Sequence, residues 1–354
     1  MKLSLVIPTY NEKENIENLI LEILSNFDKN KINGEIIIVD DNSEDQTGVI
    51  VENMKEKYNN IYVIHRDGKL GLSSAVLEGF MVSNGEILGV MDADLSHPVD
   101  KINEMFQSIQ NGADMAIGSR YIKGGHIKGW NLHRKVLSKG ATLLARIFTE
   151  VKDPMSGFFM FKKEYFVKEN INSKGFKILL ELLVKLNYKQ IVEIPYVFIN
   201  RTKGKSKANT GEIIYYLENL IKYLPYKKEI ILQFIRFAFV GIIGTLLNII
   251  ILYILTEYYQ VYYVLSAIIS FVIAITLNYF LNKMWTFREL IGNSIVNKYF
   301  KFFAVGLIAL SVNVFFLYIL TEVFKFYYII SQIVAISLSF FINFIGNKIW
   351  TFSK

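Results

Sequence analysis

The sequence predicts an α/β domain with a mostly parallel sheet, followed by an all-α membrane domain of four helices arranged as two tandem two-helix repeats. Two observations predict this division. Short β-rich runs alternate with amphipathic helical patterns over residues 1–210, an order typical of α/β domains. Residues 230–354, in contrast, contain 8 of the 39 Lys and Arg and 3 of the 32 Asp and Glu, few for a soluble domain of that length.

The composition excludes several classes of protein. Hydrophobic residues make up 52% of the chain, which is too many for a disordered or fibrous protein. The chain has no cysteine, so disulfides, thiol catalysis and cysteine metal sites are excluded. Much of the excess basic charge flanks the apolar segments, which indicates membrane orientation, and no nucleic-acid partner is expected.

The α/β domain is expected to fold from seven strands and the helices between them. The predicted strands are 3–8, 35–40, 61–65, 86–91, 114–118, 157–162 and 191–198. Apolar residues from Ile16 to Phe27 keep helical spacing after the first strand. The other predicted helices are 45–57, 72–83, 99–111, 136–148 and 176–187.

The membrane domain is predicted from four long apolar runs. These runs are about 231–256, 261–282, 299–321 and 327–347, and each can cross about 30 Å of hydrocarbon. A shift of 65 residues maps Leu252–Glu257 onto Leu317–Glu322 and Trp285–Phe287 onto Trp350–Phe352 without a gap, which indicates a parallel repeat. Residues 211–229 are expected to form an amphipathic interface helix and linker on the membrane surface.

The orientation follows from the basic residues near the ends of the spans. The nine basic residues on one side are Lys227, Lys228, Arg236, Lys283, Arg288, Lys298, Lys301, Lys348 and Lys354. The turns on the other side contain only Lys325. The positive-inside rule therefore predicts a multi-pass protein with the α/β domain and both termini in the cytoplasm. The cell membrane is the expected location, and the alternative is an endoplasmic reticulum membrane with the domain facing the cytosol.

Polar residues collect at the predicted carboxyl ends of the strands, where open α/β sheets bind ligands. Pro8–Glu12 ends the first strand, Asp40 and Asp41 end the second, and Asp92-Ala93-Asp94 follows the fourth. Two carboxylates one residue apart can direct hard oxygen ligands at one Mg²⁺ or Mn²⁺ ion that also binds a diphosphate. Ser96 or His97 could add a ligand or a supporting contact. The alternative is a pair of solvated turn carboxylates.

Six motifs in order carry a family resemblance. They are VIPTYNE (6–12), VDDNS (39–43), GLSSA (71–75), MDADLSHP (91–98), GSRY (118–121) and DPMSGF (153–158). Together they resemble family 2 glycosyltransferases of the GT-A fold, and most of all the dolichyl-phosphate mannose synthases. Residues 230–354 resemble the four-helix GtrA-like domain found in some of these enzymes.

The resemblance implies two groups of donor-site residues. The nucleotide and donor set is Pro8, Tyr10, Asn11, Glu12, Asp40, Asp41, Asp92, Ala93, Asp94, Arg201 and Lys207, with Lys69 near the donor. The implied metal ligands are Asp92 and Asp94, and Ser96 stands where some relatives carry Gln. Arg201 and Lys207 would close over the diphosphate, or would form a basic patch attracted to anionic lipid.

The resemblance also implies an acceptor-phosphate site of Arg120, Arg134 and Ser138. The implied catalytic residues are Asp94, Arg120, Arg134 and Asp153. Asp153 stands where many relatives have a base, and here it could instead orient the sugar or Arg134. The alternatives are ordinary salt bridges for the two arginines and a plain loop carboxylate for Asp153.

The expected reaction is an inverting transfer of mannose from GDP-mannose to dolichyl (polyprenyl) phosphate, giving dolichyl phosphate mannose and GDP. The acceptor phosphate is mostly dianionic near neutral pH, so it is already a nucleophile. The residues alone do not select the donor, and UDP-glucose or a related hexose donor is the alternative. Two other classes are a flippase for the lipid-linked sugar, formed by the membrane domain, and a binding module without catalysis.

Overall fold

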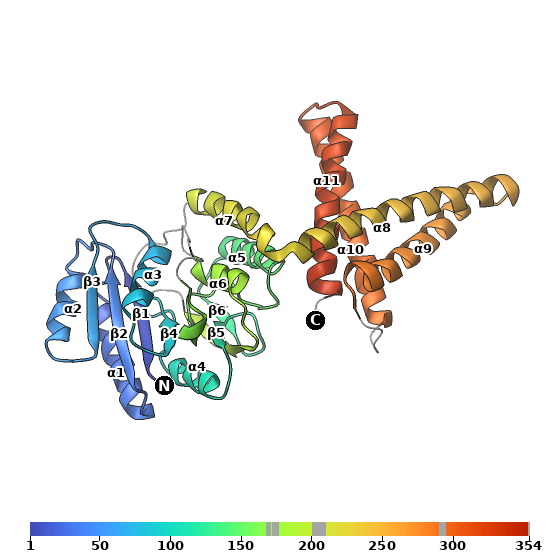
Figure 1. Cartoon of the computed structure of the whole chain (residues 1–354). Coiled ribbons are helices and arrows are strands. Elements are labelled where there is room, and N and C mark those ends of the chain that lie inside the picture. The colour runs from blue at the N-terminus through green and yellow to red at the C-terminus, as the bar shows by residue number, and fades with distance from the viewer. Residues whose placement is uncertain (168–170, 172–176, 200–209, 290–294, 353–354) are drawn as a thin grey trace. The chain divides into compact units, whose positions relative to one another are not determined.

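The structure is a computed structural model of all 354 residues (Figure 1), and it describes all of them except 168–170, 172–176, 200–209, 290–294 and 353–354. The chain divides into two compact units, residues 1–226 and residues 227–354. Helix α7 (Thr210–Tyr223), which covers most of the predicted interface segment, belongs to the first unit.

The first unit is built on a seven-stranded sheet of order β3-β2-β1-β4-β7-β5-β8. The strands are β1 (Leu3–Thr9), β2 (Gly34–Asp40), β3 (Ile61–His65), β4 (Ile87–Val90), β5 (Met115–Ser119), β7 (Phe159–Lys162) and β8 (Ile191–Pro195). Strand β7 runs antiparallel to β4 and β5, and the other neighbours pair in parallel. The predicted mostly parallel sheet is therefore confirmed.

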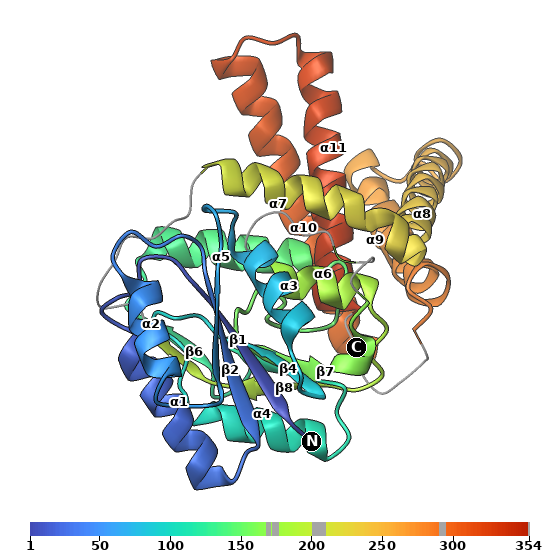
Figure 2. The same cartoon turned by 60° about the vertical axis from the view of Figure 1, so that its left-hand side comes forward.

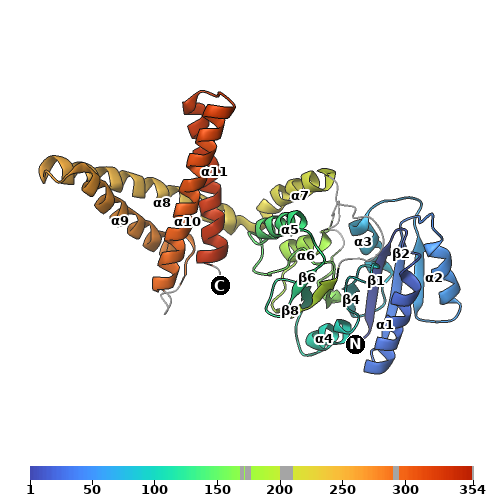
Figure 3. The same ribbon diagram turned by 180° about the vertical axis from the view of Figure 1, so that it is seen from behind.

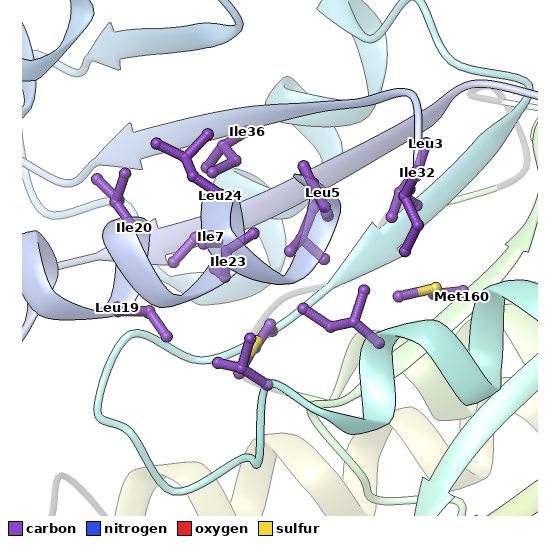
Figure 4. Close-up of a cluster of buried hydrophobic side chains, with 14 of the residues drawn as sticks. Leu3, Leu5, Ile7, Leu19, Ile20, Ile23, Leu24, Ile32, Ile36 and Met160 are labelled. Atoms are coloured by element: carbon purple, nitrogen blue, oxygen red, sulfur yellow. The ribbon is translucent and has the colours of Figure 1, made fainter. Parts of the chain in front are cut away.

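Helices cover both faces of this sheet (Figure 2). They are α1 (Ile16–Asn30), α2 (Thr47–Lys55), α3 (Leu72–Val82), α4 (Lys101–Gln110) and α6 (Ile178–Lys185). Along β1, Leu5 and Ile7 pack with α1 and α4 (Figure 4), whereas Val6 packs with α3 and α6. Successive side chains of a strand point to opposite faces, so a strand buried on both sides is apolar at most positions.

The segment predicted as one strand over 191–198 forms two. Strand β8 ends at Pro195, and β9 (Val197–Ile199) leaves the main sheet to pair with β6 (His126–Lys128). Tyr196 joins the two sheets, because its amide donates to Ser119 O and its carbonyl accepts from the His126 amide, both at 3.2 Å. The sequence analysis missed β6, since three residues are too few for an alternating pattern.

Helix α5 (Leu132–Ala145) begins four residues before the predicted start. The side chain of Asn131 accepts the Arg134 amide at 2.9 Å and so caps the helix at that point. Helix α7 packs on α5, where Tyr216 Oη donates to Ala141 O at 2.6 Å (Figure 3). Large apolar side chains remain exposed on both helices; we call Leu132, Val136, Leu137, Leu143, Tyr215, Leu217 and Ile221 the α5–α7 surface.

Among the described residues, the second unit has four helices that are long and apolar enough to cross a membrane. They are α8 (Lys228–Tyr253), α9 (Tyr263–Leu281), α10 (Ile295–Tyr318) and α11 (Tyr328–Gly346), and each continues into a short π-helical turn. Helix α8 packs on α9, and α10 packs on α11. Phe287 and Phe352, which are equivalent in the repeat, stack with ring centroids 4.6 Å apart. The two repeats therefore contact each other through equivalent residues.

Candidate active site

Three neighbouring parallel strands end at one edge of the sheet and bring the predicted donor residues together. Strands β2, β1 and β4 are adjacent, and Thr9 lies opposite Asp40 in the register. Because the strands are parallel, the segments that follow Thr9, Asp40 and Val90 all leave the same edge.

The Asp92-Ala93-Asp94 segment follows β4 directly and differs in burial from residue to residue. Ala93 is buried in the hydrophobic cluster that contains α1 and α4, whereas Asp92 is partly exposed and Asp94 is 8% exposed. Asp94 Oδ1 accepts the Ser96 amide at 3.2 Å. A Cβ atom at Gly157 would lie 2.9 Å from Asp92 Oδ2, so only glycine leaves room for this carboxylate. The side chain of the predicted donor residue Ala93 therefore packs in the core.

His97 supports this segment from beneath. Its Nδ1 accepts the Asp92 amide at 3.2 Å, so in the neutral ring the proton is on Nε2, which lies 3.8 Å from Asp92 Oδ2. The ring stacks on Phe158 with centroids 5.1 Å apart. Burial lowers the pKa of His97 to about 4, although the charge of Asp94 opposes this shift. His97 therefore makes the supporting contact with the backbone of Asp92.

The side chains of this segment fit a divalent cation. The Ser96 hydroxyl is buried and has no hydrogen-bond partner among the described residues. In the part of the chain that the structure describes, no three His, Asp or Glu side chains lie close enough together to hold a metal ion by themselves. A metal ion here would take oxygen ligands from Asp92, Asp94 and the Ser96 hydroxyl, and a diphosphate would fill further positions.

The first two strand ends are tied together by the residues predicted to hold the nucleotide. Asp40 Oδ1 accepts Thr9 Oγ1 at 3.1 Å and the Ser43 hydroxyl at 2.5 Å. Asn11 Oδ1 accepts the Glu44 amide at 3.0 Å, and the Asn11 backbone, with φ of 57°, donates to Ser43 Oγ at 2.8 Å. The Glu12 amide likewise donates to Thr47 Oγ1, and Pro8 pairs with Val39 within the sheet. These hydrogen bonds therefore join the segment after β1 to the segment after β2.

Asp41 holds the glycine-containing loop that follows β3. Its Oδ1 accepts Arg66 Nη1 at 2.7 Å, and its two oxygens accept the amides of Leu70 and Gly71 at 3.0 and 2.8 Å. The loop places Lys69 Nζ 4.2 Å from the centre of the Tyr10 ring, at the end of β1. Lys69 and Tyr10 therefore lie together, as a shared donor site requires.

Arg66 is a supporting residue that the sequence analysis missed. It is buried, and it also donates to Ser74 Oγ at 2.9 Å and pairs with Glu78 at 3.0 Å. Its charge offsets that of Asp41, which is also buried. A basic residue directly after a strand and before a Gly-Lys-Leu-Gly turn was the available signal.

Arg120 and Asp153 form a buried ion pair. Arg120 Nε and Nη2 donate to the two Asp153 oxygens at 2.8 Å, and the Arg120 amide donates at 2.9 Å. Burial alone lowers the pKa of a guanidinium, but the hydrogen bonds and charge of Asp153 outweigh this and raise the pKa of Arg120 above its ordinary value. Asp153 thus holds Arg120 in place.

The backbone around Asp153 is fixed by Glu193 on β8. Glu193 Oε1 accepts the Asp153 amide at 3.1 Å, and Oε2 accepts the Lys152 amide at 2.8 Å. The sequence analysis missed Glu193, although a single acidic residue inside the apolar run of β8 was a usable signal. Carboxylates that accept two backbone amides commonly fix a loop, so Glu193 sets the position of Asp153.

The predicted acceptor residues Arg120, Arg134 and Ser138 form one cluster. Trp130 contacts both arginines: the guanidinium carbon lies 4.2 Å from the ring centre for Arg134 and 5.8 Å for Arg120. The hydroxyls of Tyr121 and Ser138 share a hydrogen bond of 3.0 Å. Tyr121 follows Arg120 directly, and Ser138 lies one turn after Arg134 on α5. The sequence analysis missed Trp130, because only the tertiary structure brings it to both arginines.

An aromatic cluster connects this acceptor cluster to the Asp92–Asp94 segment. Phe198 lies 6.1 Å from His97, 5.3 Å from Trp130 and 5.6 Å from the guanidinium carbon of Arg120. The aromatic side chain of Phe198 therefore contacts both His97, beside the Asp92–Asp94 segment, and the cluster of Arg120 and Trp130. The predicted donor residues Arg201 and Lys207 lie outside the described residues.

Two family models match the chain, one in each unit. The glycosyl transferase family 2 model matches residues 4–168, and the GtrA/DPMS transmembrane domain model matches residues 236–352. Dolichol-phosphate mannosyltransferase of Pyrococcus furiosus is 38% identical over 354 residues, covering 98% of each chain. The protein of that name from Saccharomyces cerevisiae is 40% identical over 234 residues, which cover 63% of this chain and 87% of that one. The chain therefore belongs to glycosyltransferase family 2, as a membrane-protein relative of the dolichol-phosphate mannosyltransferases that carries a GtrA/DPMS transmembrane domain.

Proposed function

We propose that this chain transfers mannose from GDP-mannose to dolichyl (polyprenyl) phosphate with inversion at the anomeric carbon. The observation that carries this proposal is the joining of two subsites by one aromatic cluster. One subsite offers oxygen ligands from Asp92 and Asp94, and the other offers two guanidinium groups. The names of the relatives support mannose and dolichyl phosphate as substrates.

On the donor side, the chain would bind the nucleotide between the ends of β1 and β2 and the loop at Lys69. Tyr10 and Lys69 lie together there, and Asp40 and Asp41 fix the backbone around them. Asp92, Asp94 and Ser96 would hold Mg²⁺ or Mn²⁺. Such an ion, when bound, would neutralise charge that develops on the leaving diphosphate.

On the acceptor side, Arg120 and Arg134 would hold the lipid phosphate, with Ser138 as a hydrogen-bond donor. Two guanidinium groups match the charge of a phosphate dianion and can donate several hydrogen bonds to it. A phosphate oxygen would attack the anomeric carbon directly, and the nucleoside diphosphate would leave from the opposite face. Asp153 would keep Arg120 oriented, and no side chain needs to remove a proton from the phosphate.

The reaction would take place at the cytoplasmic face of the cell membrane. The distribution of basic residues around the four spans supports this orientation. Helices α5 and α7 both expose large apolar side chains, as expected for a surface that lies on lipid. A long polyprenyl chain could then stay in the membrane while its phosphate reaches Arg134.

The test is sugar transfer by the full chain in detergent, with GDP-mannose and UDP-glucose offered separately alongside a polyprenyl phosphate and Mg²⁺ or Mn²⁺. We expect metal-dependent mannosyl lipid from GDP-mannose and at least a hundredfold loss in Asp94→Asn. Asp100→Asn is the matched control, because Asp100 is exposed and makes no side-chain cap bond at the start of α4. Transfer from UDP-glucose alone would correct the donor, and no transfer from either would overturn the proposal.

We assign an anchoring role to the four membrane helices. In vesicles that contain the full chain, a fluorescent short-chain mannosyl phospholipid should cross the bilayer no faster than in protein-free vesicles. A chemical quencher added outside measures the fraction that has crossed. Faster crossing by both the unmodified chain and Asp94→Asn would show instead that the membrane domain flips the lipid-linked sugar.

A further inference from the structure

We propose that Trp130 is a positioning residue for the acceptor phosphate, and that its indole face holds Arg134 in place beside Arg120. This inference rests on the proposed function and adds a residue that no motif of the sequence marks. The centre of the Trp130 ring lies 4.2 Å from the guanidinium carbon of Arg134 and 5.8 Å from that of Arg120. The ring also contacts Phe198.

The Trp130 ring is itself held by its neighbours. It packs edge-on against Phe198 with centroids 5.3 Å apart, and it follows Gly129, whose φ of 81° makes a turn that other residues rarely adopt. The next residue, Asn131, caps α5. Trp130 therefore lies between a glycine turn and a capped helix, and both restrict its backbone.

Arg134 needs such support because of its place in α5. It lies in the first turn, where the helix dipole disfavours a positive side chain, and that turn contains no acidic residue. The buried charge of Arg120 lies near the same ring. An indole face attracts a guanidinium, with an energy that rises as water is excluded. Stacking on Trp130 therefore favours the ordered position of Arg134 over solvated positions farther away.

The indole has a feature that a phenyl ring would lack. Its Nε1 is buried and has no hydrogen-bond acceptor among the described residues. A buried donor without a partner is unfavourable, and Phe at this position would avoid it. Trp has, however, the most strongly cation-binding face of the aromatic residues. The presence of Trp at this position is consistent with a role in holding cations.

A chain of contacts connects Arg120 to Arg134. Tyr121, the residue after Arg120, shares a hydrogen bond with Ser138, and Ser138 lies one turn from Arg134 on the same face of α5. Trp130 completes this circuit by contacting both arginines. Loss of the ring should therefore weaken binding of the acceptor phosphate and leave binding of the donor unchanged.

The test is a double-mutant cycle on steady-state transfer by the full chain, with Trp130→Leu, Arg134→Gln and the double variant. We expect Trp130→Leu to raise the KM for the lipid phosphate about tenfold, equivalent to about 1.4 kcal/mol, with donor KM and kcat changed less than about twofold. Trp130→Phe should raise the acceptor KM about threefold. In the Arg134→Gln background, Trp130→Leu should add less than about twofold, because the ring acts through that arginine.

Trp285→Leu is the matched control, since it removes an indole in the second unit and should leave the acceptor KM unchanged. If Trp130→Leu fails to fold, fluorinated tryptophan in the Trp285→Phe/Trp350→Phe background weakens the cation–π contact with little change of shape, and acceptor KM should rise with fluorination. Two results would overturn the inference, provided that the unmodified chain transfers sugar. One is full additivity of the effects of Trp130→Leu and Arg134→Gln on the acceptor KM, and the other is an acceptor KM that does not change with fluorination. Absence of transfer by the unmodified chain would overturn the proposed function and this inference with it.

Discussion

Asp153 is a buried carboxylate that holds an arginine of the candidate site in place. Both of its oxygens bind Arg120, and its own amide is held by Glu193. Breaking such a buried pair leaves a charge without its partner, which commonly costs about 3–5 kcal/mol. In the proposed reaction Asp153 therefore acts through Arg120, and the acceptor phosphate needs no base.

Gly157 is the residue that gives Asp92 room. In Gly157→Ala, the new Cβ would lie 2.9 Å from Asp92 Oδ2 and push the carboxylate away from the site. We expect the metal concentration for half-maximal transfer to rise about tenfold, with thermal stability changed little. Gly140→Ala, on the open face of α5 with nothing within 4 Å, is the control. Equal metal dependence in the two variants would contradict the role of Gly157.

Asp114 makes a pH-dependent contribution to stability far from the site. Burial raises the pKa of this carboxyl, but amides of Gln190 and Lys189 and the Lys162 ammonium outweigh burial and lower it to about 2. A lowered folded-state pKa stabilises the protein above the unfolded value of about 4, and that contribution is lost as the pH falls toward 2.

Asp114→Asn should therefore lower the free energy of unfolding by about 2 kcal/mol at pH 7. The difference between the two proteins should shrink below pH 4 and be small near pH 2. Chemical denaturation of the full chain in detergent across this range measures it. A difference that stays constant with pH would contradict the account.

The sequence identifies candidate site residues more readily than it identifies the residues that they contact. Asp92 and Asp94 stand out in the sequence because they directly follow an apolar run, and their role as metal ligands stays a prediction. The partner of Asp153 could not, since Arg120 is 33 residues away and the pairing depends on how β5 and the loop at 153 meet. The assignment of Arg120, Arg134 and Ser138 to an acceptor phosphate stays a prediction, although the structure brings them together.

Long helices and strands could be predicted from the sequence, whereas very short ones could not. Helices and buried strands were predicted because their apolar periods extend over several residues. Strand β6 and the break after Pro195 were missed, because a three-residue strand has no period and only its partner β9 defines it. The earlier start of α5 depended on one capping bond from Asn131.

The α8–α9 hairpin depends on a close approach at Gly244. A Cβ atom there would lie 2.3 Å from the side-chain amide atoms of Asn278, whereas one at Gly241 on the same helix would meet nothing within 4 Å. Gly244→Ala should therefore lower the stability of the second unit by about 1–3 kcal/mol. Gly241→Ala should be neutral or slightly stabilising, because alanine favours a helix.

Thermal unfolding of the two variants in detergent measures this difference. The result expected is a lower midpoint for Gly244→Ala alone. Equal midpoints would mean that Asn278 can move aside and that the close helix approach contributes little to the hairpin.

For the whole molecule, the sequence predicted both architectures because each has its own pattern. Charge density and alternating elements marked the first unit, and the 65-residue repeat marked the second. The stacking of Phe287 on Phe352 shows that the repeat in the sequence is also a repeat of contacts. What the sequence could not predict was the aromatic cluster around Phe198, which gathers residues from several distant segments.

We propose one site that joins a nucleotide-sugar subsite to a lipid-phosphate subsite, with the phosphate as nucleophile. The most direct measurement offers labelled GDP-mannose to the full chain with polyprenyl phosphate or with the polyprenol of equal length. The anomeric configuration of the isolated product is then determined by NMR. The account predicts transfer to the phosphate alone, with a configuration opposite to that of the donor. Transfer to the polyprenol, or a retained configuration, would contradict it.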